Sequence, residues 1–116
     1  MLGKESEDVE ELKNMLKRHS REDIMFNEPH FTHQLMLREG DKEAVIMNML
    51  HPDKLVYSFQ QVGKYGDIIH CLHFGISNSR TLRIPVIFRK DKTLYILTYI
   101  VRYRRWQNMV RGGYLR

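Results

Sequence analysis

The sequence predicts an α+β fold in which two or three N-terminal helices pack on a four-stranded antiparallel meander sheet. Apolar residues recur at helical spacing in the first half of the chain and at alternating positions after His51-Pro52. Turn-forming residues separate the later β-rich runs by intervals short enough for hairpins. Helices followed by strands are typical of the α+β class.

Three helices and a short extended segment are predicted before the strands. Acidic residues open the first helix and basic residues close it, which suits the helix dipole. Gly40 is expected to end the second helix, and Asp41 is expected to cap the third. The expected helices cover residues 7–19, 30–39 and 42–50, and the extended segment covers residues 21–27, stopped before Pro29.

Four strands are expected, over residues 54–62, 67–74, 81–89 and 93–104. In the third, alternation sends Arg83 and Arg89 to the face opposite the apolar core. Pro85 cannot donate to a sheet hydrogen bond, which indicates an edge, a bulge or a locally open strand. The fourth is apolar on both faces, with Tyr99 on one and Arg102 on the face of Leu94. It is therefore central or contacts a partner, and a homodimer is one alternative.

The 116 residues are enough for one hydrophobic core, so we expect a single domain. It divides into an acidic N-terminal helix (1–20), a core (21–104) and a basic C-terminal tail (105–116) in which Trp106 anchors on the domain. The sequence shows no apolar run of membrane-spanning length and no secretory signal, so we expect a cytoplasmic protein without a membrane partner.

Basic charge is concentrated at the end of the sequence, since residues 80–116 carry ten basic and one acidic side chain. Arginine forks bind phosphate and aromatic rings stack on unpaired bases, so their interleaving favours single-stranded RNA as a ligand. Alternatively, the tyrosines only build the sheet and the arginine stems only cover it. The set is Arg80, Arg83, Arg89, Tyr95, Tyr99, Arg102, Tyr103, Arg104, Arg105 and Trp106.

The same residues suit a metal-independent ribonuclease, which needs a base, an acid and positive charge at the transition state. The catalytic candidates are His30, Tyr99 and Arg83, with Tyr99 or His30 transferring protons. The RNA-binding candidates are Arg80, Arg89, Arg102, Arg104, Arg105 and Trp106. No cofactor is expected, and no metal either, because His70 and His73 point to opposite faces of a strand and no CxxC or HExxH motif is present.

Over residues 24–104 the chain resembles small phage- and plasmid-derived domains related to the BrnT and RelE toxins. The segments that carry the resemblance are PHFTHQLMLREG, DKEAVIMNMLHPDKLVYSFQQVGKYGD and LRIPVIFRKDKTLYILTYIV. His30 stands where the family helix opens with histidine, and Arg83 and Arg89 fall on its basic strand. The resemblance implies a microbial-ribonuclease type of sheet, free or ribosome-bound RNA as substrate and an acidic antitoxin as partner. A binding module without catalytic activity, which uses the basic sheet for RNA or an acidic protein, is the alternative.

Overall fold

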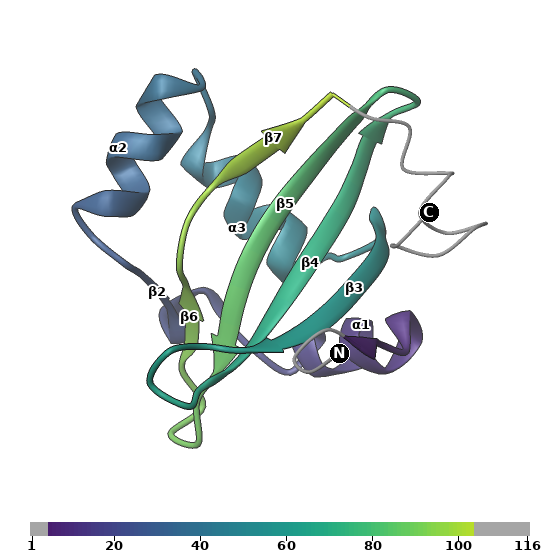
Figure 1. The fold of residues 1–116 in the computed structure, drawn as a ribbon, viewed down its shortest axis with the longest axis vertical. Coiled ribbons are helices and arrows are strands. Elements are labelled where there is room, and N and C mark those ends of the chain that lie inside the picture. The colour runs from purple at the N-terminus through teal and green to yellow at the C-terminus, as the bar shows by residue number, and fades with distance from the viewer. Residues whose placement is uncertain (1–4, 104–116) are drawn as a thin grey trace.

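The computed structural model describes residues 5–103 as three α-helices, one short 3-10 helix (Arg21–Asp23) and seven strands in one sheet (Figure 1). The helices are α1 (Val9–Lys17), α2 (His30–Leu37) and α3 (Lys42–Leu50). The strands are β1 (Glu5–Ser6), β2 (Ile24–Phe26), β3 (Leu55–Val62), β4 (Ile68–Ser77), β5 (Arg80–Phe88), β6 (Leu94–Ile96) and β7 (Ile100–Arg102). The α+β class and the three helices are confirmed. Within these residues no helix has the length and apolarity that crossing a membrane requires.

The sheet is not the plain four-stranded meander predicted from the sequence. Its order is β1-β3-β4-β5-β6-β2. β7 also pairs with β5, at residues 81–83, whereas β6 pairs with residues 86–88 of that strand. β3, β4 and β5 do form the expected antiparallel meander. Of the predicted extended segment 21–27, Arg21–Asp23 forms a 3-10 helix instead, and Ile24–Phe26 becomes β2, which pairs in parallel with β6 and makes the sheet mixed. This pairing joins residues about 70 positions apart, so local periodicity could not reveal it.

The predicted fourth strand is broken into β6 and β7 by an extra residue. Ile96 lies opposite Val86, and Val101 lies opposite Leu82. Val101 follows Ile96 by five residues, whereas their partners on β5, Leu82 and Val86, are four residues apart. A bulge of this kind reverses the alternation of every residue that follows it.

The break lies opposite Pro85, whose carbonyl oxygen accepts a hydrogen bond from the Leu97 N–H at 3.0 Å. It turns Tyr99 toward the helices, where only 7% of its surface is exposed. It also turns Arg102 to the opposite face, so the prediction that Arg102 shares the face of Leu94 is wrong. The broad apolar surface expected beside a partner is correspondingly reduced, because Tyr99 belongs to the core.

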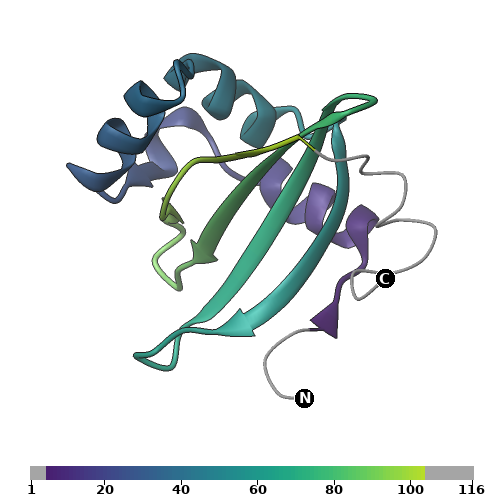
Figure 2. The same ribbon diagram turned by 45° about the horizontal axis from the view of Figure 1, so that its top comes forward.

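All three helices lie on one side of the sheet (Figure 2). Asp8 caps α1 by accepting hydrogen bonds from the Glu10 and Glu11 N–H groups, and Asp41 caps α3 through the Glu43 N–H. One apolar core fills the space between the helices and the sheet. Its members are Leu12, Leu16, Phe31, Leu35, Val45, Met49, Leu55, Leu72, Phe74, Leu82, Ile84, Val86, Leu94, Ile96 and Tyr99.

We call the opposite side of the sheet the second face. Residues directly paired across neighbouring strands point to the same side, so the pairing defines it. Its members are Tyr57, Phe59, Gln61, Ile69, Cys71, His73, Thr81, Arg83, Pro85, Ile87, Tyr95, Ile100 and Arg102.

Candidate nucleic-acid interface

Two of the predicted RNA-contacting arginines are neighbours on the second face. Arg83 pairs with His73 on one side and Ile100 on the other, and Arg102 pairs with Thr81, two residues earlier on the same strand as Arg83. Arg83 is thus directly beside His73 on the neighbouring strand, and Arg102 is diagonal to Arg83 on the strand beyond it. The bulge before β7 is what brings Arg102 to this face.

His73 lies beside these two arginines and is buried, with 2% of its surface exposed. Burial is the main cause that lowers its pKa to about 4, and the charges of Arg83 and Arg102 add to this. The ring is therefore neutral at pH 7, and its Nδ1 lies 3.0 Å from the Cys71 carbonyl oxygen. A proton on His73 would place a third positive charge beside Arg83 and Arg102, and their repulsion adds to the effect of burial in disfavouring it.

Aromatic rings surround His73. Its ring centroid lies 5.6 Å from that of Tyr57, in an edge-on arrangement, and 5.7 Å from that of Phe59. We call Tyr57, Phe59 and His73 the aromatic group. The guanidinium of Arg83 lies 5.3 Å from the Phe59 ring centroid, within the range of a cation–π contact.

The Arg83 side chain retains unused hydrogen-bonding capacity. Its Nε is buried without a hydrogen-bond partner, and its Nη2 lies 3.9 Å from the Cys71 sulfur, which is a weak acceptor. Within residues 5–103, no salt bridge involves Arg83, Arg89 or Arg102. The second-face residues defined above include no aspartate or glutamate. Arg83 and Arg102 therefore have no acidic partner within residues 5–103, whereas Asp91, whose pKa is lowered by hydrogen bonds from Thr93 and also by the charge of Arg89, lies near Arg89.

Arg89 follows the far end of β5. Its guanidinium lies 4.1 Å from the ring centroid of Tyr95, which belongs to the second face because it pairs with Ile87. The Tyr95 hydroxyl donates to the Asn27 side-chain oxygen at 3.0 Å, which fixes the ring. Arg89 is six residues from Arg83 along one strand, a distance of roughly 20 Å at 3.3 Å per residue.

Tyr99 and Arg80 lie instead in a cavity of about 280 Å³ on the helix side. Burial raises the pKa of Tyr99, so its phenol stays protonated near neutral pH and is not poised to act as a base. Gly40 packs directly against the ring, because a Cβ there would lie 2.6 Å from Tyr99 Cζ. The left-handed residue after α2 is Glu39, with φ of 51°. Gly40 is needed for close packing.

His30 opens α2, where its Nε2 lies 3.0 Å from the Thr98 hydroxyl oxygen. It is exposed and lies with Tyr99 on the helix side, whereas Arg83 is on the second face. The three catalytic candidates are therefore not assembled in one centre, because the sheet separates Arg83 from the other two. The remaining RNA-binding candidates, Arg104, Arg105 and Trp106, fall outside the described residues.

The two strand histidines point to opposite faces, as their spacing predicted. His70 is on the helix side, where its Nδ1 lies 2.8 Å from the Glu7 carboxylate. Burial raises the pKa of Glu7, but the hydrogen bond and charge of His70, together with hydrogen bonds from Ser58 and Gln60, outweigh burial and lower it. Within residues 5–103, no three histidine, cysteine, aspartate or glutamate side chains are grouped to hold a metal ion.

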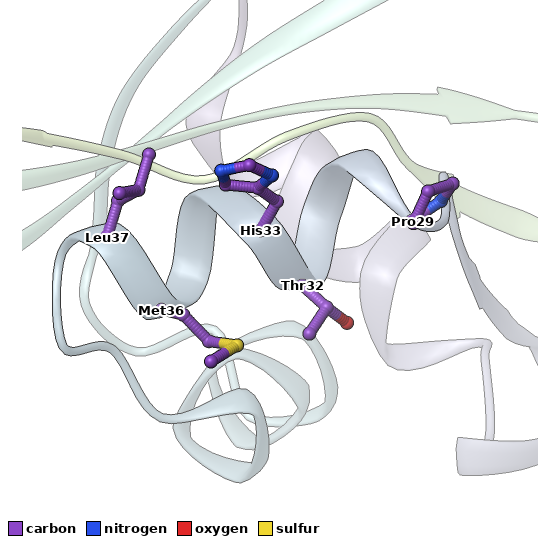
Figure 3. A pocket seen from close by; sticks show the side chains of 5 residues that line it. All are labelled: Pro29, Thr32, His33, Met36 and Leu37. Atoms are coloured by element: carbon purple, nitrogen blue, oxygen red, sulfur yellow. The ribbon is translucent and has the colours of Figure 1, made fainter.

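A second hollow, of about 570 Å³, lies on the outer surface of α2 (Figure 3). Its lining is mainly apolar, and Met36 and Leu37 there are 72% and 63% exposed. The figure shows His33 and Leu37 on one side of the helix and Thr32 and Met36 on another, so the side chains do not converge. None of the RNA-contact candidates lines this hollow.

The aromatic group is the part of the site that the sequence analysis missed. The signal was present, since alternation in β3 places Tyr57 and Phe59 on one side together with Gln61.

In comparisons with known proteins, no family model, no curated protein and no solved structure matches the chain. The relationship to BrnT and RelE toxins therefore stays a prediction from sequence pattern.

Proposed function

We propose that the protein binds single-stranded RNA on the second face of its sheet. The carrying observation is that Arg83 and Arg102 lie side by side there, without an acidic partner among the described residues. Phosphate oxygens are the acceptors that such guanidinium groups bind in bidentate fashion. Arg89 with Tyr95 offers a second contact roughly 20 Å along the strand, where the ring can stack on an unpaired base.

The geometry favours binding over cleavage. Acid–base catalysis needs its groups within hydrogen-bond reach of one bond, and Tyr99 and Arg83 lie on opposite sides of the sheet. Tyr99 also has a raised pKa, which disfavours a role as the base. A ribonuclease of the toxin type, with an acidic antitoxin covering the arginines, is the alternative that the family resemblance implies.

The test is fluorescence anisotropy with a labelled single-stranded RNA over a range of salt concentrations. Arg83→Gln and Arg102→Gln should each weaken binding about tenfold, because each removes a charged hydrogen bond to phosphate. Each should also reduce the slope of log K against log salt by about 1. The matched control is Arg38→Gln, which removes the same charge from the end of α2, where Arg38 donates to Gln34.

Two results would overturn this proposal. One is equal loss of affinity in the Arg38, Arg83 and Arg102 variants, which would indicate only nonspecific attraction to a basic protein. The other is no binding by the unmodified protein at low salt. Cleavage of the RNA in the presence of a chelator, abolished by Tyr99→Phe, would instead support the ribonuclease alternative.

A further inference from the structure

The cavity of about 280 Å³ on the helix side is lined by four exposed residues that carry charge. Glu39 and Asp41 come from the link between α2 and α3, whereas Lys54 precedes β3 and Arg80 begins β5. The acids therefore belong to the helix layer and the cations to the sheet layer. None of the four forms a salt bridge with another residue in the range 5–103. The cavity thus holds both signs of charge without pairing them.

The inner wall of the cavity is apolar and carries one hydroxyl group. Tyr99 and Leu82 are buried there, and Ile76 and Val101 pack against the same core. Within residues 5–103 the Tyr99 hydroxyl makes no hydrogen bond, and it is not one of the enclosed polar atoms without a partner. Because the side chain lines the cavity, this hydroxyl is accessible to a molecule bound there. A protonated phenol can donate a hydrogen bond to such a molecule.

The size and lining of the cavity restrict the class of molecule that fits. Pockets for drug-sized ligands have volumes of about 300–1,000 Å³, so this one suits a smaller molecule. An aliphatic group packed on Leu82 and Val101 is stabilised by removing apolar surface from water. A carboxylate and an ammonium in one molecule match the cations of the sheet layer and the acids of the helix layer. A free amino acid with an aliphatic side chain has all three features.

We propose that the helix-side cavity binds a free aliphatic amino acid. Its carboxylate binds the Arg80 guanidinium and accepts a hydrogen bond from the Tyr99 hydroxyl. Its ammonium binds Asp41, which caps α3 through Oδ1 and so keeps Oδ2 for this contact. The aliphatic side chain lies on the apolar inner wall. This inference goes beyond RNA binding on the second face and does not depend on it, because the sheet separates the two sites.

The first test compares L-leucine with two analogues by isothermal titration calorimetry on the unmodified protein. 4-Methylpentanoate keeps the carboxylate and carbon skeleton of leucine but lacks the ammonium. 3-Methylbutylamine keeps the ammonium but lacks the carboxylate. L-Leucine should bind about tenfold more tightly than either analogue, because each analogue loses one charged hydrogen-bonding group. This comparison needs no variant and so does not depend on one that folds.

The second test separates the two charged contacts by substitution. Arg80→Gln should weaken the binding of both L-leucine and 4-methylpentanoate about tenfold, because both carry the carboxylate. Asp41→Asn keeps a side chain that can cap α3, and it should weaken the binding of L-leucine but not of 4-methylpentanoate. Tyr99→Phe should weaken L-leucine binding about fivefold. The matched control is Arg18→Gln at the exposed end of α1, outside the cavity lining, which should leave both affinities unchanged.

Three results would overturn the proposal. One is the absence of saturable binding by L-leucine up to its solubility limit. Another is equal affinity for L-leucine and 4-methylpentanoate, because the cavity would then bind anions alone. The third is an equal loss of affinity in the Arg18 and Arg80 variants, which would place the binding site outside this cavity.

Discussion

The buried imidazole of His73 should make the stability of the protein fall between neutral and mildly acidic pH. Its pKa is about 4 in the folded protein and 6.5 for an ordinary histidine. As the pH falls below 6.5, the unfolded chain takes up this proton while the folded protein does not. The free energy of unfolding therefore decreases until the pH approaches 4.

The size of this effect follows from the difference between the two pKa values. Each unit corresponds to about 1.4 kcal/mol, so a fall from about pH 7 to about pH 4.5 should cost about 2.5 kcal/mol. Urea unfolding followed by circular dichroism at both pH values measures it. In His73→Gln this share of the pH dependence should be absent, whereas His33→Gln, an exposed change on α2, should retain it. Equal pH dependence in all three proteins would refute the reasoning.

Two further predictions concern packing and charge on the helix side. Gly40→Ala should destabilise by about 1–3 kcal/mol, because the new Cβ would lie 2.6 Å from Tyr99 Cζ. Urea unfolding should show a smaller cost in a Tyr99→Leu background. Gly63→Ala should cost less than about 1 kcal/mol, because its closest contact, at 3.0 Å, is the end of the Ile69 side chain. Glu7→Gln should cost about 1–3 kcal/mol at neutral pH, because it replaces the carboxylate that accepts hydrogen bonds from Ser58 and Gln60 and lies 2.8 Å from His70 Nδ1. This cost should shrink below pH 4.5, where the lowered pKa of Glu7 no longer favours the folded state, and a constant cost would contradict the pairing.

The helices could be predicted because their signals are local. Asp41 caps α3 through the hydrogen bond that its position suggests, and α3 covers the residues expected from periodicity. The meander of β3, β4 and β5 was also readable, because short turns force neighbouring strands to pair. The parallel pairing of β2 with β6 was not, because it joins segments far apart in the chain.

The candidate site was predictable only as far as strand alternation holds. Arg83 was assigned correctly to the face opposite the core, since β5 is regular. Arg102 was assigned to the wrong face, because alternation was counted through the bulge. Pro85 indicated a disturbance in the sheet, but a missing N–H does not tell which neighbouring strand gains a residue.

Residues 97–99 link β6 to β7 and contain the bulge. The number of residues in this link decides which side chains of β7 point to the core and which point to the second face. Removing one residue from 97–99 would restore simple alternation with β5. Arg102 would then turn toward the apolar core, and Tyr99 would leave its place against Gly40. A substitution at Leu97 or Thr98 leaves this residue count unchanged, whereas a single deletion would change it. The length of this link therefore determines both that Tyr99 lies in the core and that Arg102 lies on the basic second face.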